Sequence, residues 1–430
     1  MPRVRRLGRA AVAAVAFALV CAAPALAKQP YPLNFHTVDF SKGAAAGLTY
    51  SSGAVSLATP VGTIDYTDPY ADFASDGVDG SGMYEYGTWT SPVYDLTFPF
   101  NELVSSWNAQ TPPGTWIQSE MRPLIDDGHW AKWYILGRWS YGDSDFHRTS
   151  VGHQGDGDGY VAIDTFFAKD HPAVAYQLRL TLFRRVGSSA TPTVTRFSAI
   201  ASNLTNQKNT FPSATTMDGQ KIDLGGPNPG DFPSYSQELH HGEYPQFDGG
   251  GEAWCSPTST AMVVDHFGYG PPASDYAYVY GDYPDVVDPV VDFTARMVYD
   301  YHYQGAGNWP FNTAYAAAQG LVADVTQLHN LREAEPFIKD GIPLIASVAW
   351  SSNKLDTAIK STNGHLLVIG GFTGDGDVIA YDPASTDDAA VRHVYDREQF
   401  ERAWIPASGG IVYVDRPPSW PTPDLTANNS

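Results

Sequence analysis

Cys255 is the residue of this chain best placed for covalent chemistry. The sequence holds two cysteines, Cys21 and Cys255. Three glycines at 249–251 allow an unusual backbone path before Cys255, and Pro257 suits the first turn of a helix. The free N–H groups at a helix start favour an anion, so this position favours a reactive thiolate. The alternative is that Cys255 is a small buried side chain, which is common for cysteine.

His365 and Asp382 are the candidate partners of this thiol, because a thiolate nucleophile needs a base and a group that orients the base. A buried strand at 366–369 follows His365, and a return strand at 378–381 ends at Asp382. A hairpin turn centred near Gly374 puts Asp382 one residue from the position opposite His365. Opposed residues have Cβ atoms about 5 Å apart, so the hairpin predicts a hydrogen bond between the two side chains. The alternative is that they are unrelated polar residues at strand ends.

The motifs around these residues resemble those of papain-clan cysteine peptidases. The likeness is greater to the bacterial leader-peptidase-like group, whose best-known members cut after double-glycine leaders during bacteriocin export. It covers about residues 232–414 and departs at Ser256, where that group usually has glycine. The matching segments are Tyr235-Ser236-Gln237, Trp254-Cys255-Ser256-Pro257-Thr258-Ser259, Gly364-His365 and Tyr381-Asp382-Pro383.

The resemblance implies a papain-like fold and a role for each site residue. Cys255 is then the nucleophile, His365 the general base and Asp382 the group that orients the base. A glutamine before the cysteine donates to the oxyanion; Gln237 fits the short motif better, while Gln246 is nearer in sequence. Without a transporter domain, the leader-processing role does not carry over.

The second half of the chain has the pattern of an α+β domain, with helices first and strands after them. Helices are predicted at 258–267, 292–303, 313–319 and 331–339, and strands at 344–350, 366–371, 378–382 and 410–414.

The first half has the pattern of an all-β sandwich or jelly roll. Its segment Ser91-Pro92-Val93-Tyr94-Asp95-Leu96, leading to Ser106-Trp107-Asn108-Ala109, resembles the jelly-roll modules attached to secreted carbohydrate-active enzymes. Val174 to Leu182 alternates apolar and polar residues with the period of a half-buried strand. Further strands are predicted at 116–122, 130–139 and 160–167. Tryptophans in this half could stack on a cell-wall glycan or fill the core, and the core is favoured. They are Trp89, Trp107, Trp116, Trp130, Trp133 and Trp139.

The first 27 residues predict a secretory signal peptide. A basic start carries four arginines, an apolar run at 10–23 follows, and Ala25-Leu26-Ala27 is a small-residue cleavage site. Its removal would leave a protein that is secreted and extracellular or cell-wall associated, with no membrane span. A membrane anchor is the alternative.

The charge balance disfavours nucleic acid as a partner. The net charge is −21, and it becomes −25 without the signal segment, which carries four arginines and no acid. A large acidic excess repels phosphate backbones. No cofactor or metal is predicted, because Asp156-Gly157-Asp158-Gly159 and Asp375-Gly376-Asp377 match calcium loops only in part and are better explained as turns.

These observations predict a multi-domain protein. Its parts are a signal peptide at 1–27, a β-sandwich accessory domain at 28–202, a linker at 203–230, a papain-like cysteine peptidase domain at 231–415 and a disordered Pro-rich tail at 416–430.

The leading functional hypothesis is a secreted cysteine peptidase, a hydrolase that forms a thioester acyl-enzyme with a peptide or protein substrate. A transglutaminase-like acyltransferase would use the same triad, but the strand after His365 lacks the His-x-Trp-x-Glu pattern that many of these enzymes carry. The third hypothesis is a catalytically inactive cell-surface binding protein, which Ser256 and the tryptophans motivate.

Overall fold

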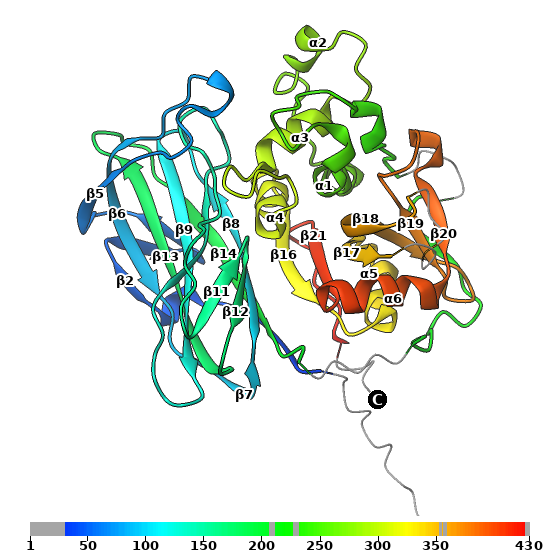
Figure 1. Cartoon of the computed structure of the whole chain (residues 1–430), viewed down its shortest axis with the longest axis horizontal. Helices are drawn as coiled ribbons and strands as arrows, with labels where there is room; N and C mark the ends of the chain where they lie inside the picture. Colours follow the sequence, from blue (N-terminus) through cyan, green and yellow to red (C-terminus); the bar gives the residue numbers. More distant parts are fainter. Residues whose placement is uncertain (1–30, 206–210, 227–231, 352–354, 356–358, 426–430) are drawn as a thin grey trace, which may run out of the picture.

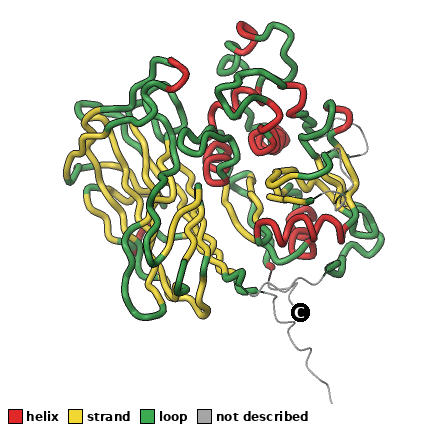
Figure 2. The backbone as a smooth tube through the Cα atoms, viewed as in Figure 1, coloured by secondary structure: helices red, strands yellow, loops and turns green. Residues whose placement is uncertain are grey.

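The computed structural model describes residues 31–205, 211–226, 232–351, 355 and 359–425, so the predicted signal peptide at 1–27 lies outside the described residues. Strands are the most common regular element of these residues and form three antiparallel sheets, and there are six α-helices. Two sheets form the N-terminal half, and the third, with the helices on its faces, forms the C-terminal half (Figure 1, Figure 2). No helix in these ranges is long and apolar enough to cross a bilayer.

The N-terminal half consists of two seven-stranded sheets. One has the order β11-β12-β8-β14-β4-β3, with β1 paired to β14, and the other has the order β10-β9-β13-β6-β2, with β5 on β6 and β7 on β13. The first comprises β1 (Leu33–Thr37), β3 (Leu48–Ser51), β4 (Ala54–Leu57), β8 (Glu102–Gln110), β11 (Gly159–Ala162), β12 (Thr165–Ala168) and β14 (Thr193–Ser202). The second comprises β2 (Ala44–Ala46), β5 (Gly62–Tyr66), β6 (Gly82–Thr90), β7 (Tyr94–Phe100), β9 (Thr115–Ile125), β10 (Tyr134–Trp139) and β13 (Ala173–Arg185).

The alternation that predicted a half-buried strand is visible in β13. Leu178, Leu180 and Leu182 are fully buried in the core, whereas Gln177 and Arg179 point to the other face and are half-buried. Successive side chains of a strand face opposite sides of the sheet, so this pattern sets which face of β13 joins the core.

The segment 160–167 is not one strand, as the sequence predicted, but a hairpin. β11 ends at Ala162 and β12 begins at Thr165, so Ile163 and Asp164 form the turn. Ile163 has a φ of 58°, a conformation that a β-branched residue rarely adopts. Isoleucine and aspartate at these positions are not a usual hairpin-turn pair, so this turn could not be predicted from its residues.

Four of the six N-terminal tryptophans fill the core. They are Trp89, Trp107, Trp116 and Trp139, each at most 1% exposed. Trp130 and Trp133 are half-buried, and the guanidinium of Arg122 lies over both rings, 4.7 and 4.9 Å from their centroids. One face of each of these two rings is therefore already occupied by a cation.

The C-terminal half is built on a sheet of order β16-β21-β17-β18-β19-β20, with β15 paired to β18. Its strands are β15 (Ile222–Asp223), β16 (Val322–Gln327), β17 (Leu344–Trp350), β18 (Thr362–Phe372), β19 (Val378–Tyr381), β20 (Arg392–Tyr395) and β21 (Ile411–Arg416). The helices are α1 (Cys255–His266), α2 (Val279–Asp282), α3 (Val290–Val298), α4 (Trp309–Ala318), α5 (Leu331–Lys339) and α6 (Arg397–Ser408). The bounds of α5 and β17 were predicted correctly, whereas α2, α6, β15, β16 and β20 were not predicted.

Helices cover both faces of this sheet (Figure 1). On one face α1 places Met262 and Val263 in a cluster with Val368 and Tyr413. On the other face α5 and α6 pack against β17 and β18, and Trp404 of α6 belongs to that core. The catalytic cysteine candidate at the start of α1 is thereby fixed against the middle of the sheet.

Parts of the predicted linker and tail belong to the fold of the C-terminal half. β15 pairs with β18, and the carboxylate of Glu335 accepts hydrogen bonds from Thr215 Oγ1 and Thr216 N, both 2.7 Å. Beyond β21, the ring of Trp420 packs on Phe267 with centroids 5.6 Å apart. Residues 211–226 and 417–425 therefore lie against the domain, while 206–210, 227–231 and 426–430 are outside the described residues.

The two halves share a hydrophobic core. Phe311 of α4 packs against Trp107 and Trp139, with ring centroids 6.2 and 5.4 Å apart. Arg148 is fully buried, and its guanidinium donates to main-chain oxygens of both halves, including Ser140 at 3.0 Å and Arg296 at 2.8 Å. The position of one half relative to the other is thus fixed by packing and by hydrogen bonds.

Candidate active site

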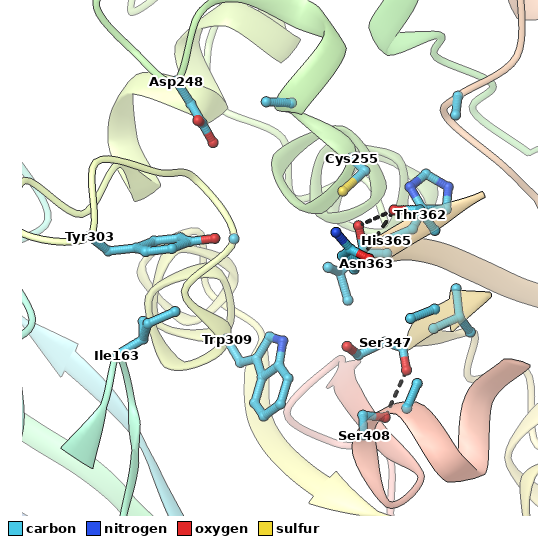
Figure 3. Close-up of a pocket in the computed structure, with 18 of the residues that line it drawn as sticks. Ile163, Asp248, Cys255, Tyr303, Trp309, Ser347, Thr362, Asn363, His365 and Ser408 are labelled. Carbon is cyan, nitrogen blue, oxygen red and sulfur yellow. Dashed lines mark hydrogen bonds between the residues drawn. The ribbon is translucent and has the colours of Figure 1, made fainter. Parts of the chain in front are cut away.

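Cys255 is the first residue of α1 and is partly exposed. The turn before it, η4 (Gly251–Ala253), starts after Gly250, whose φ is 101°. A Cβ at Gly250 would lie 2.9 Å from the main-chain oxygen of Glu243, so the glycine permits both the angle and the close approach. This loop delivers the thiol to the cavity drawn in Figure 3.

The His365 ring lies between Cys255 and Asp382. Its Nε2 is 2.7 Å from Asp382 Oδ1, and both side chains are buried. The thiol of Cys255 is near enough to the same ring to contribute to its raised pKa, and Figure 3 shows the two side chains beside each other. In the hairpin Val368 pairs with Tyr381, one residue away from the register expected from the turn. The structure therefore brings Cys255, His365 and Asp382 together, with a hydrogen bond between the last two.

The Asp382 carboxylate is held from three directions. Besides His365, Oδ1 accepts the N–H of Ala384 at 3.0 Å, and Oδ2 accepts the hydroxyl of Tyr395 at 2.7 Å. Tyr395 is the last residue of β20, a strand that the sequence analysis did not predict. The contact of Tyr395 with Asp382 therefore could not be predicted from the sequence, although it fixes the rotation of the Asp382 carboxylate.

Electrostatics favour the protonated form of His365. Burial by itself lowers the pKa of this imidazole, but the charge of Asp382, its hydrogen bond and the contact with Cys255 outweigh burial and raise the pKa to about 10. Burial likewise opposes ionisation of Asp382, while the charge and hydrogen bond of His365 bring the pKa of that carboxyl below its ordinary value. An imidazolium–carboxylate pair is thus stable at neutral pH beside the thiol.

Gln237 lies on the same cavity as Cys255, at the start of η3 (Gln237–His240). Its Nε2 donates to the main-chain oxygen of Glu252 at 2.7 Å and to the carboxylate of Glu238 at 3.2 Å, while its Oε1 is buried with no partner among the described residues. Gln246 is exposed and does not line the cavity. Of the two glutamines, only Gln237 lines the cavity that holds the thiol.

Ser256 points away from the cavity. It is fully buried, and its hydroxyl lies 2.9 Å from that of Tyr413 on the sheet. The resembling peptidases usually have glycine at this position. The serine hydroxyl is accommodated here by a hydrogen bond inside the domain, and Ser256 does not line the cavity around Cys255.

Both halves of the chain line this cavity, which has a volume of about 670 Å³. Figure 3 shows Cys255 beside His365, with Ile163, Tyr303 and Trp309 across the cavity from His365. The N-terminal half contributes the tip of the β11–β12 hairpin, with Ala162, Ile163, Asp164, Thr165 and Phe167. This wall was not predicted, because residues 160–167 have the pattern of a single strand.

One largely buried cluster of the described residues has donor atoms close enough to hold a metal ion. It consists of His240, Glu243 and Asp292, and the ligand atoms lie within 4.8 Å of one another. Nδ1 of His240 is 2.9 Å from Glu243 Oε2 and 3.0 Å from Asp292 Oδ2. Burial opposes protonation of His240, but the two carboxylates raise its pKa, so a proton on the imidazole also satisfies this geometry. Asp156, in the partial calcium motif, accepts the N–H groups of Asp158 and Gly159, as expected of a turn.

Comparisons with known proteins assign both halves to related families. A model of the peptidase C39 N-terminal domain matches residues 34–202, and a model of the peptidase C39-like family matches residues 230–412. A search of curated proteins found no match. A crystal structure described as a C39-like peptidase from Bacillus anthracis is 17% identical, covers 45% of this chain and 97% of its own, and superimposes with a TM-score of 0.27.

Proposed function

This chain belongs to the C39 group of papain-clan cysteine peptidases, and on that premise we propose that it hydrolyses peptide bonds with Cys255 as nucleophile, His365 as general base and acid, and Asp382 as the group that orients His365. The observation that supports the proposal best is the thiol of Cys255 beside a buried imidazole that is hydrogen-bonded to the Asp382 carboxylate, with the thiol and the imidazole on one large cavity. Nucleophile, base and orienting group in contact are the requirements of covalent catalysis.

The reaction proceeds in two halves. The Cys255 thiolate adds to the substrate carbonyl carbon, and the His365 imidazolium gives its proton to the departing amine as the peptide C–N bond breaks. The product is a thioester on Cys255 and a free amine. A water molecule then attacks the thioester while His365 takes its proton, which releases the carboxylic acid and restores the thiol–imidazole pair.

Two N–H donors are available for the oxyanion. As the first residue of α1, Cys255 has a main-chain N–H without a partner inside the helix. Nε2 of Gln237 supplies the second donor after it exchanges Glu238 for the substrate oxygen. Loss of one such donor typically lowers kcat by about 10²–10³-fold.

The finer architecture and the location of the protein belong to the same proposal. The two antiparallel sheets of the N-terminal half, which share a core, support a jelly-roll-like sandwich, and the α1–sheet arrangement around Cys255 supports a papain-like domain. The basic start, apolar run and Ala25-Leu26-Ala27 site support export of the protein and removal of residues 1–27.

The test compares the protein from residue 28 onward with its Cys255→Ala variant. Iodoacetamide labelling between pH 5 and 8, followed by intact-mass measurement, should mark Cys255 faster than free cysteine at low pH. A peptide-library digest should give cleavage products with the parent and none with the variant. Cleavage by Cys255→Ala would overturn the assignment. Labelling at the rate of free cysteine would favour a binding protein, and incorporation of an added amine would favour acyl transfer.

A further inference from the structure

The tip of the β11–β12 hairpin gives the N-terminal half a direct place in the proposed active site. Ile163 and Asp164 line the same cavity as Cys255 and His365, although they lie about 90 residues before the cysteine in the sequence. Figure 3 shows Ile163 beside Trp309, across the cavity from His365. A substrate that reaches Cys255 through this cavity must therefore pass the hairpin tip.

The conformation of Ile163 lowers the stability of the hairpin. Its φ of 58° is a strained conformation for a β-branched residue, and 37% of its surface is exposed. Glycine or asparagine would adopt the same angle at lower cost. An exposed, strained isoleucine that faces a cavity is better explained by what it contacts in that cavity than by the fold.

The hairpin tip is fixed to the C-terminal half by a hydrogen bond. Asp164 Oδ2 accepts the N–H of Trp309 at 2.8 Å, and Asp164 Oδ1 accepts the hydroxyl of Thr165 at 2.9 Å. Trp309 begins α4 and itself lines the cavity. The wall is therefore positioned before substrate arrives, which reduces the entropy cost of binding.

The lining of the cavity combines apolar and acidic surfaces. Ile163, Phe167, Tyr303 and Trp309 supply an apolar and aromatic surface. Glu238, Asp248 and Glu252 supply carboxylates, and no lysine or arginine is among the described lining residues. A bulky apolar side chain fits the first surface, and a positive charge beside it fits the second.

We propose that the hairpin tip around Ile163 is a substrate-binding wall of the peptidase site. Together with the carboxylates of Glu238, Asp248 and Glu252, this wall selects cationic peptides that carry a bulky apolar side chain next to the bond attacked. The inference rests on the proposed function, because the wall matters only if Cys255 attacks a peptide. The N-terminal half is then part of the enzyme's specificity and not a separate binding module.

The test uses peptidyl chloromethyl ketones that alkylate Cys255, with iodoacetamide as the small reference reagent. The probes are acetyl-Lys-Leu, acetyl-Glu-Leu and acetyl-Lys-Gly chloromethyl ketones, and the readout is the second-order rate of mass increase. Lys-Leu should react fastest with the parent. Ile163→Gly should slow the Lys-Leu probe by about 10-fold, the scale of a lost apolar contact, and leave the iodoacetamide rate unchanged. Glu252→Gln should reduce the preference for Lys-Leu over Glu-Leu, and added salt should do the same.

Two controls separate a substrate contact from a structural role. Ile163→Gly relieves the backbone strain, so its melting temperature should equal or exceed that of the parent while its Lys-Leu rate falls. Val186→Asn changes an exposed apolar residue outside the cavity and should leave every rate unchanged. Equal rates for the three probes, or no effect of Ile163→Gly, would overturn the inference while fast iodoacetamide labelling leaves the proposed function standing. Slow labelling by all reagents would overturn both.

Discussion

The hydroxyl of Tyr395 donates a 2.7 Å hydrogen bond to Asp382 Oδ2, on the opposite side of the carboxylate from His365. Tyr395 lies on β20, which pairs with β19, the strand that ends directly before Asp382. A neighbouring strand thus contributes a side chain to the proposed triad. Because both carboxylate oxygens are engaged, the plane of Asp382 and, through it, the ring of His365 are held in one orientation. Tyr395 is in this sense a positioning residue.

Replacing Tyr395 by Phe should lower kcat/KM by about 10-fold, since a hydrogen bond to a charged group is worth about 1.5–3 kcal/mol. The hydroxyl helps to keep the pKa of Asp382 below its ordinary value, so its loss should raise that pKa and move the acid limb of the activity profile to higher pH. Rates measured between pH 4 and 9 test this. Tyr381→Phe is the control, because its hydroxyl faces Asp223; an unchanged acid limb in Tyr395→Phe would contradict the role.

Stability should depend on pH through His365. Its pKa is raised to about 10 in the folded protein from 6.5 in the unfolded chain. A raised pKa means that the contribution of this group to stability is complete below pH 6.5 and is lost as the pH rises through about 10. The difference in melting temperature between the parent and His365→Gln should therefore shrink from pH 6 to pH 10. A constant difference would show that the imidazole does not hold its proton in the fold.

Asp382→Asn should leave the fold intact and reduce activity strongly. The amide still accepts a hydrogen bond but lacks the charge that stabilises the imidazolium, so the thiolate–imidazolium pair weakens. Alkylation by iodoacetamide near pH 6 should slow and recover only at higher pH. Asp387→Asn is the matched control, because that carboxylate accepts the N–H of Ala390 in the adjacent loop. If the alkylation profile of Asp382→Asn equals that of the parent, another group orients His365.

Gln237→Ala should separate oxyanion stabilisation from thiol reactivity. Loss of the side-chain donor should lower kcat on peptides by about 10²–10³-fold, while iodoacetamide, which forms no oxyanion, should alkylate Cys255 at the parent rate. Gln246→Ala changes the exposed glutamine nearer to the cysteine and should leave both rates unchanged. Equal losses of peptide hydrolysis and alkylation in Gln237→Ala would mean that the residue supports the thiol and not the oxyanion.

The parts of this fold that follow local sequence patterns could be predicted. α5 lies between Asn330, which caps it, and Gly341, and the hairpin of β18 and β19 is bounded by a Gly/Asp turn, so these elements and the approach of His365 to Asp382 follow from short-range rules. Contacts between segments that are far apart in the sequence are not marked by any local pattern of residues. Tyr395 reaches Asp382 through an unpredicted strand, and Ile163 reaches the cavity through a turn without turn residues.

The junction of the two halves gives the last prediction. Asn108 of β8 pairs with Ala323 at the outer edge of β16: its Nδ2 donates to the Ala323 oxygen at 2.7 Å, and its Oδ1 accepts the Ala323 N–H at 3.3 Å. β16 pairs with β21 alone among the described strands, so this side chain, together with the hydroxyl of Ser106, which accepts the N–H of Val325 at 3.1 Å, takes the place of a neighbouring strand at this edge. Asn108→Ala should leave a buried N–H and C=O without partners, at a cost of about 1–3 kcal/mol for each such group.

Urea unfolding of Asn108→Ala should therefore have a lower midpoint than that of the parent, and Asn34→Ala, at a half-buried position on β1, should change the midpoint little. Because the cavity takes its walls from both halves, the same variant should also react more slowly with the Lys-Leu chloromethyl ketone than with iodoacetamide, relative to the parent. If Asn108→Ala unfolds at the parent urea concentration, water or a shifted strand satisfies the edge of β16, and the junction depends on the packing of Phe311 between Trp107 and Trp139 instead.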